Sequence, residues 1–149
     1  MWGLFGYRRA GVLAALTLVA APASAQPGPI RLHLDEETSI GGIDVACTGV
    51  GQTKDLPKWT AYPVKLEFAD PKGAYYADEE VTVAEGKGAA LLDVTCEGPW
   101  LLLKLPPGKA FKIEARLQQS GVAPKDATVK APSHGQATFV LTFPVDASS

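Results

Sequence analysis

The chain has 149 residues, of which 46% are hydrophobic and 20% charged, and its formal net charge is −2. This mild acidity excludes the strongly basic proteins that bind nucleic acid or anionic lipid through a stripe of lysines and arginines. A chain of this length is sufficient for one domain with a substantial core and too short for two. We therefore expect a single domain with no nucleic-acid partner.

The first 25 residues have the pattern of a cleavable signal peptide. An arginine pair precedes an apolar run of about a dozen residues, and Ala23 and Ala25 form the A-x-A pattern that signal peptidase recognises. The apolar run is too short to cross the ~30 Å hydrocarbon core as a helix. We predict cleavage between Ala25 and Gln26 and a mature domain of residues 26–149 with no membrane span. The mature chain is then periplasmic or fully secreted.

The rest of the chain is dominated by short runs in which apolar and polar residues alternate, as in half-buried β-strands. An unbroken apolar run adds a further strand at residues 100–105. The alternating runs cover residues 30–34, 41–47, 64–68, 81–83, 90–96, 111–117, 127–131 and 137–143. The strongest helix candidate, residues 50–56, is one or two turns long. This pattern predicts an all-β fold, an antiparallel Greek-key-type β-sandwich of about seven to nine strands.

Two cysteines, Cys47 and Cys96, each end an alternating run whose apolar residues share the face of the cysteine. Both thiols are therefore expected to point toward the buried surface. In an exported chain, a pair of cysteines is read by default as a disulfide. A redox pair or a metal site fits less well, because there is no C-x-x-C motif and both histidines are distant in sequence.

Residues 98–115, GPWLLLKLPPGKAFKIEA, predict a strand, a tight corner and a second strand. The first strand lacks alternation, so we expect it to be buried on both faces or to lie at a crowded corner. Pro106 and Pro107 withhold amide donors and end the pairing of that strand. Gly108 supplies the positive φ of a type II turn, and alternation resumes at Phe111.

The same stretch resembles the G-P-x-x-x-x-x-L-P-P-G-x-Y-x-V segment of carboxypeptidase regulatory-like domains, which are transthyretin-like (prealbumin-like) sandwiches. The segments GAYYADEEVTV and GGID…GVGQ are similar to those of small secreted bacterial members, so the resemblance covers about residues 41–143. The family aromatic would fall at Ala110, whereas Phe111 comes one residue later, and this offset predicts a bulge at the strand start. The resemblance implies a secreted accessory role with no catalytic residue.

The sequence contains few candidates for catalytic or metal-binding residues. Nucleophilic catalysis needs a serine or cysteine near a histidine and a carboxylate. His33 lies on the outward face of the first expected strand and His134 in the turn PSHG, so both are interpreted as surface histidines. The acidic runs at 35–37 and 78–80 lack calcium-loop spacing and are interpreted as solvated loop charges. The transthyretin fold also hosts a hydrolase of purine breakdown, but the C-terminal FPVDASS lacks the tail of that family. We expect no enzyme activity, metal or cofactor.

The aromatic residues are the remaining candidates for binding. Trp59, Tyr62, Tyr75 and Tyr76 gather in the expected loops. Exposed, they would form a platform for a sugar ring or a protein partner; buried, they would close the ends of the core. The sequence leaves both alternatives open. Trp100 follows Cys96 closely and is expected to cover the disulfide.

These observations favour a non-enzymatic secreted or periplasmic β-sandwich that binds an unidentified protein or cell-envelope component. The alternative is a carbohydrate-binding module, for an envelope glycan, that uses the loop aromatics. An enzyme is the least favoured class.

Overall fold

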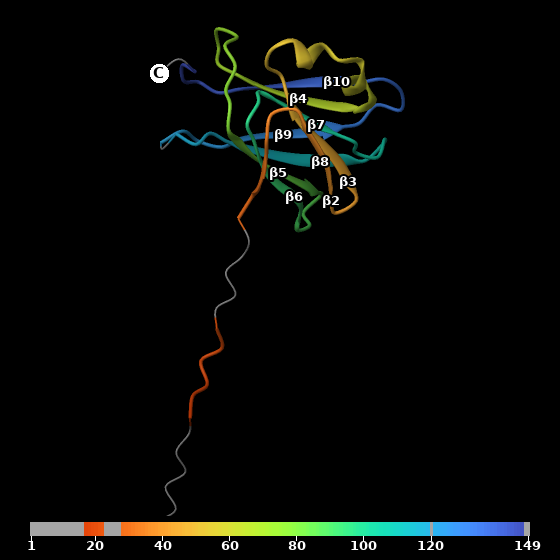
Figure 1. Ribbon diagram of the computed structural model, residues 1–149. Helices are drawn as coiled ribbons and strands as arrows, with labels where there is room; N and C mark the ends of the chain where they lie inside the picture. Colours follow the sequence, from red (N-terminus) through yellow and green to blue (C-terminus); the bar gives the residue numbers. More distant parts are fainter. Residues whose placement is uncertain (1–16, 23–27, 120, 148–149) are drawn as a thin grey trace, which may run out of the picture.

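The computed structural model describes residues 17–22, 28–119 and 121–147 (Figure 1). Most of the predicted signal peptide, with the cleavage position between Ala25 and Gln26, lies outside these residues. No helix within the described ranges is long and apolar enough to cross a membrane. The strands are β1 (Ile30–Leu32), β2 (Glu36–Ile40), β3 (Ile43–Thr48), β4 (Val64–Ala69), β5 (Glu79–Glu85), β6 (Ala90–Cys96), β7 (Trp100–Leu103), β8 (Ala110–Arg116), β9 (Lys125–Lys130) and β10 (Ala137–Thr142).

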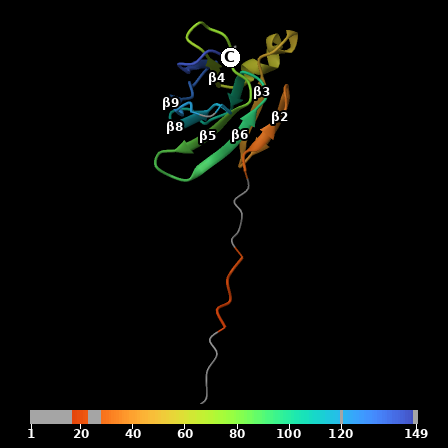
Figure 2. The same ribbon diagram turned by 90° about the vertical axis from the view of Figure 1, so that its left-hand side faces the viewer.

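The strands form two five-stranded sheets that pack face to face (Figure 2). The first sheet has the order β1-β6-β5-β8-β9, and the second has the order β10-β4-β7-β3-β2. Alternate residues of both sheets meet in one apolar core, as the period-two pattern of each strand requires. The all-β sandwich predicted from the sequence is therefore confirmed.

The pairing of the strands differs from a purely antiparallel sandwich. β1 lies parallel to β6, and β10 lies parallel to β4. Each of these pairs joins segments that are far apart in sequence, so no tight hairpin connects them and no hairpin forces an antiparallel arrangement. The first and last strands of the chain thus both occupy sheet edges.

The strand β2 was not predicted, and it brings the number of described strands to ten. Its sequence, EETSI, shows no apolar alternation, and its first two acids were interpreted as loop charges. It forms because Gly41 and Gly42 adopt positive φ angles of 58° and 82° and make a two-residue hairpin with β3. Pairing with β3, rather than burial of an apolar face, therefore defines this strand.

The apolar run of β7 is buried on both faces, the first of the two alternatives predicted. Leu101 and Leu103 point into the core between the sheets. Leu102 points the other way and is also fully buried, against Trp59 and Tyr62. These two aromatics are carried by and beside η2 (Pro57–Ala61), a 3₁₀ helix that follows the shorter η1 (Gln52–Asp55). β7 is thus a central strand of the second sheet that is covered on each side, and the neighbouring Ala46 of β3 lies under the same aromatics.

The turn after β7 carries the chain from the second sheet to the first. Gly108 has a φ of 81°, as the predicted corner requires. The bulge predicted at the start of β8 is wrong, because β8 and β9 pair in unbroken register from Ala110 opposite Lys130 onward.

A disulfide between Cys47 in β3 and Cys96 in β6 links the two sheets, as predicted. Both cysteines are fully buried. The backbone NH of Gly98 donates to Cys47 Sγ at 3.1 Å. A side chain at Gly98 would place its Cβ 2.2 Å from the carbonyl oxygen of Thr48, so the turn beside the disulfide requires glycine.

We predict that replacing both Cys47 and Cys96 by alanine lowers the free energy of unfolding by about 4 kcal/mol, because the crosslink closes a long loop in the unfolded chain. Urea denaturation of the variant and of the wild-type protein measures the difference. Intact-mass analysis of the unreduced wild-type protein should find no free thiol. Two free thiols in that protein would contradict the assignment.

Candidate functional site

Three of the four candidate binding aromatics are part of the interior. Trp59 and Tyr62 are each 3% exposed, and Tyr76 is 6% exposed, whereas Tyr75 alone is half exposed at 50%. Trp59 and Tyr62 pack with their ring centroids 6.4 Å apart and cover the outer face of the second sheet. The exposed platform is therefore absent, and the core-closing alternative describes Trp59, Tyr62 and Tyr76.

The polar atoms of these buried rings are satisfied within the protein. Trp59 Nε1 donates to the carbonyl of Thr53 at 2.6 Å, and Tyr62 Oη donates to Glu37 at 3.0 Å. The side-chain amide of Gln136 donates to the carbonyls of both Trp59 and Tyr62. Burial raises the pKa of Tyr62, and its hydrogen bond to Glu37 adds to that shift. A sugar ring would have to displace this packing to reach either aromatic face.

Trp100 does not cover the disulfide, which corrects the sequence-based expectation. Cys47 pairs with Leu101 and faces the core, so Trp100, one residue away in β7, faces outward. Its ring packs against Gly49, and Lys65 Nζ lies 4.1 Å from the ring centroid. The proximity of Trp100 to Cys96 in sequence was misleading because side chains alternate between faces along a strand.

We predict that Trp59→Ala lowers the free energy of unfolding by about 3–5 kcal/mol, because it removes a buried ring and exposes Leu102. Tyr75→Ala is the matched control and should change stability by less than about 0.5 kcal/mol, since that ring is half exposed. Urea denaturation of both variants makes the comparison. Equal effects of the two substitutions would contradict the assignment of Trp59 to the interior.

The two histidines are not brought together. His33 lies between β1 and β2, whereas His134 lies in the loop after β9, at the opposite edge of the first sheet. No group of three or more histidine, cysteine or acidic side chains in the described ranges is arranged to hold a metal ion.

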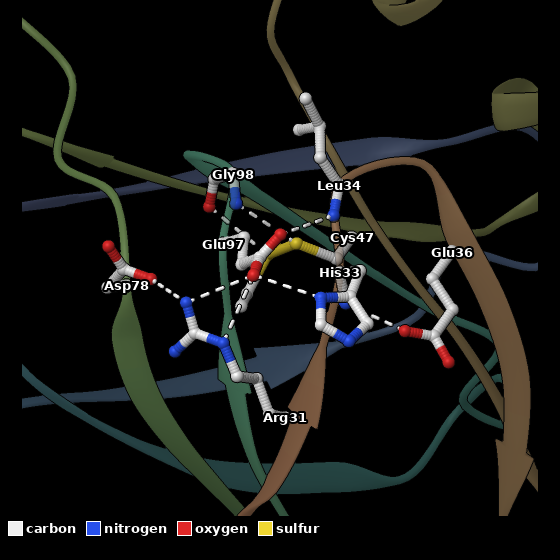
Figure 3. A network of polar contacts seen from close by, with 9 residues as sticks. Arg31, His33, Leu34, Glu36, Cys47, Asp78, Glu97 and Gly98 are labelled. Atoms are coloured by element: carbon white, nitrogen blue, oxygen red, sulfur yellow. Dashed lines mark hydrogen bonds and ion pairs between the residues drawn. A yellow bond between two sulfur atoms is a disulfide. The ribbon is translucent and has the colours of Figure 1, made fainter.

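His33 belongs to a surface network centred on the Glu97 carboxylate (Figure 3). Glu97 accepts hydrogen bonds from the backbone NH of Leu34 at 3.1 Å and from Arg31 Nε at 3.1 Å, and its Oε1 lies 3.0 Å from His33 Nδ1. The Leu34 NH and then His33 lower the pKa of Glu97. Arg31 also forms an ion pair of 2.7 Å with Asp78. Sequence patterns missed this network, because its members come from three segments far apart in the chain.

A more unusual acid lies beneath this network, at the start of β5. Glu79 is fully buried and lies opposite Cys96 in the pairing of β5 with β6, so its side chain enters the core beside the disulfide. Neither carboxylate oxygen has a hydrogen-bond partner among the described residues. Burial, reinforced by the nearby charge of Asp78, raises the pKa of Glu79 to about 9. Glu79 is therefore protonated and neutral at pH 7.

We predict that the wild-type protein loses stability as the pH rises from 5 to 8. In the folded state the pKa of Glu79 is about 9, whereas in the unfolded chain it is 4.5. As the pH rises between these two values, the unfolded chain releases the proton and the folded state keeps it, so the free energy of unfolding falls steadily. The cost amounts to about 3 kcal/mol at pH 7. Glu79→Gln, which cannot ionise, should show a nearly flat free energy of unfolding over this range and be more stable than wild type at pH 8.

Urea denaturation at several pH values tests this prediction. The carboxyls of Glu37, Asp70 and Glu97 have lowered pKa values, so their stabilising contributions are lost only in more acidic solution, outside the window. A wild-type curve that is flat from pH 5 to 8 would contradict the assignment of a buried neutral acid.

The outer faces of the two sheets differ. On the second sheet, Trp59 and Tyr62 cover the apolar residues Ala46 and Leu102. On the first sheet, the outward side chains are mainly polar and charged, and no described element lies over them; Figure 2 shows the 3₁₀ helices on the far side of the sandwich, beside β2 and β3. We call this outer face of the first sheet, from β1 to β9, the open face.

Charges on the open face are segregated along the strands. One row across the sheet is acidic and consists of Asp93, Thr82, Glu114 and Asp126. Towards the other end of β8 and β9, the outward charged side chains are Lys112 and Lys130. The open face thus presents acidic and basic groups at fixed spacing on a rigid support.

No family model matches the sequence, and the search of curated proteins found no match.

Proposed function

We propose that this chain is a non-enzymatic module that is exported with removal of residues 1–25 and that binds a protein or cell-envelope component in the periplasm or outside the cell. The resemblance to carboxypeptidase regulatory-like domains supports such an accessory role, although no family model matches. The observation that carries the proposal is the open face.

The disulfide supports the cellular location in this proposal. Disulfides form and persist in oxidising compartments and are rare in the cytosol. Cys47 and Cys96 are fully buried and join the two sheets, so the crosslink is part of the folded architecture. A crosslink of this kind supports completion of the fold in an oxidising compartment.

The open face supports binding because it needs no covering element for solubility, yet its charges are ordered. Arg116 pairs with Glu114, and the remaining acids and lysines occupy separate ends of the sheet. Such a pattern orients a partner with complementary charges and disfavours the reversed orientation. The burial of Trp59, Tyr62 and Tyr76 favours this proposal over the carbohydrate alternative, for which Tyr75 is the one exposed candidate of the four.

We predict that a photo-crosslinking amino acid in place of Thr128, exposed on the open face in β9, captures a discrete partner in the envelope of the native host. The matched control carries the same amino acid in place of Val140, which is 56% exposed on the outer face of the second sheet. Mass spectrometry identifies the adducts. An adduct from Val140 alone, or from neither position, would contradict binding through the open face.

A further inference from the structure

The open face contains a hollow beside the hairpin that connects β5 and β6. The hollow has a volume of about 280 Å³ and is floored by small side chains, including Ala84 and Ala90. It coincides with a bulge, because Val83 pairs with Leu92 while Ala84 pairs with Ala90, which leaves Leu91 as an additional residue in β6. A bulge bends its strand and increases its twist, and bulges are common beside functional sites.

The tip of the hairpin is fixed by its backbone. Gly86 has a φ of 57°, a conformation that disfavours other residues, and the NH of Gly88 donates to the carbonyl of Glu85 at 3.1 Å. This tight turn places Lys87 at the rim of the hollow. The rim is therefore a defined position in the fold rather than the end of a long loop.

Lysines are the cations at this hollow. Lys87 and Lys112 line it, and Lys130 lies diagonally from Lys112 on the same face, since Ala110 pairs with Lys130 and Lys112 with Thr128. Within the part of the chain that the structure describes, none of the three lysines forms an ion pair. The acid that lines the hollow, Glu114, is already paired with Arg116.

We propose that this hollow binds a phosphate group, either as free phosphate or on a phosphorylated sugar. Lysine ammonium groups act as point charges that suit a tetrahedral phosphate, whereas planar carboxylates are recognised best by the fork of an arginine, and no arginine lines this hollow. The Thr82 hydroxyl, also in the lining, donates to Asp93 at 3.4 Å, so the lysines are the donors on which the proposal rests. The small floor lets a phosphate approach the sheet between the lysines.

This inference deepens the proposed function, because the phosphate group is then what the open face recognises on its partner. The two proposals can fail separately. Crosslinking at Thr128 without phosphate binding would overturn the inference alone, and phosphate binding without a captured partner would overturn the proposed function alone.

Titration of the ¹⁵N-labelled mature protein with sodium phosphate tests the inference, with chloride exchanged for phosphate at constant ionic strength. We expect saturable shifts of the amide signals of Gly86, Lys87, Gly88 and Ala90. Lys112→Gln should weaken binding roughly tenfold, the effect of removing one charge-assisted hydrogen bond. The matched control is Lys125→Gln, at the opposite end of β9, whose side chain faces away from the open face; it should bind as wild type does.

A second variant separates the hollow from diffuse surface charge. Ala90→Leu keeps every lysine but fills the hollow, and it should abolish the saturable shifts. Glucose 1-phosphate and uncharged glucose are titrated in parallel; tighter binding of the sugar phosphate than of phosphate identifies a phosphorylated sugar, and equal binding identifies phosphate itself. No saturable shift with either phosphate compound, or equal weakening by Lys112→Gln and Lys125→Gln, would overturn the inference.

Discussion

The strand β7 must bury both of its faces, and much of the remaining architecture depends on that requirement. It lies at the centre of the second sheet, with Leu101 and Leu103 in the core and Leu102 on the other side. An apolar outer face on a sheet is unfavourable in water unless something covers it. The segment between β3 and β4 therefore folds into the 3₁₀ helices that bring Trp59 and Tyr62 over Leu102.

The outer face of the second sheet is covered and that of the first is not, and this difference explains where a binding surface remains. Trp59 and Tyr62, two of the four aromatics considered for ligand stacking, cover Leu102, and Tyr76 packs in the core between the sheets. On the outer face of the first sheet, the acidic row has no apolar residue, and the row of Lys112 contains only the small Ala84 and Ala90, so this face stays uncovered. Recognition on this molecule is consequently expected to be electrostatic rather than hydrophobic.

Local sequence patterns were sufficient to predict most of the strands, because a run that alternates between apolar and polar residues can bury its apolar face only as a β-strand. They failed for β2, whose residues pair with β3 without an apolar face. They also left the burial of Trp59 open, since its partners Ala46 and Leu102 come from two separate strands. The hollow could not be predicted from the sequence. The segment AEGKG indicates the turn beside it, but the bulge at Leu91 and the position of Lys112 depend on strand pairing.

Two neighbouring groups in the core make opposite contributions to the free energy of unfolding. The disulfide stabilises the folded state by about 4 kcal/mol, and the neighbouring neutral Glu79 costs about 3 kcal/mol at pH 7. Because Glu79 lies opposite Cys96, the crosslink holds together the same region that the buried acid weakens. The crosslink therefore offsets the whole cost of a group that a purely apolar core would not contain.

The parallel pairing of the terminal strands determines when the molecule can fold. During synthesis, which starts at the N-terminus, β1 has no partner until β6 has been made. Likewise β4 lacks its outer neighbour until β10, which begins only at Ala137. Pairings that are distant in sequence form slowly, because the intervening chain must be closed into a loop first. For a chain exported as we propose, a translocation channel would thus meet a polypeptide that cannot complete either sheet beforehand. For the proposed export, this order of strands favours passage in an extended form, with the fold completed on the far side.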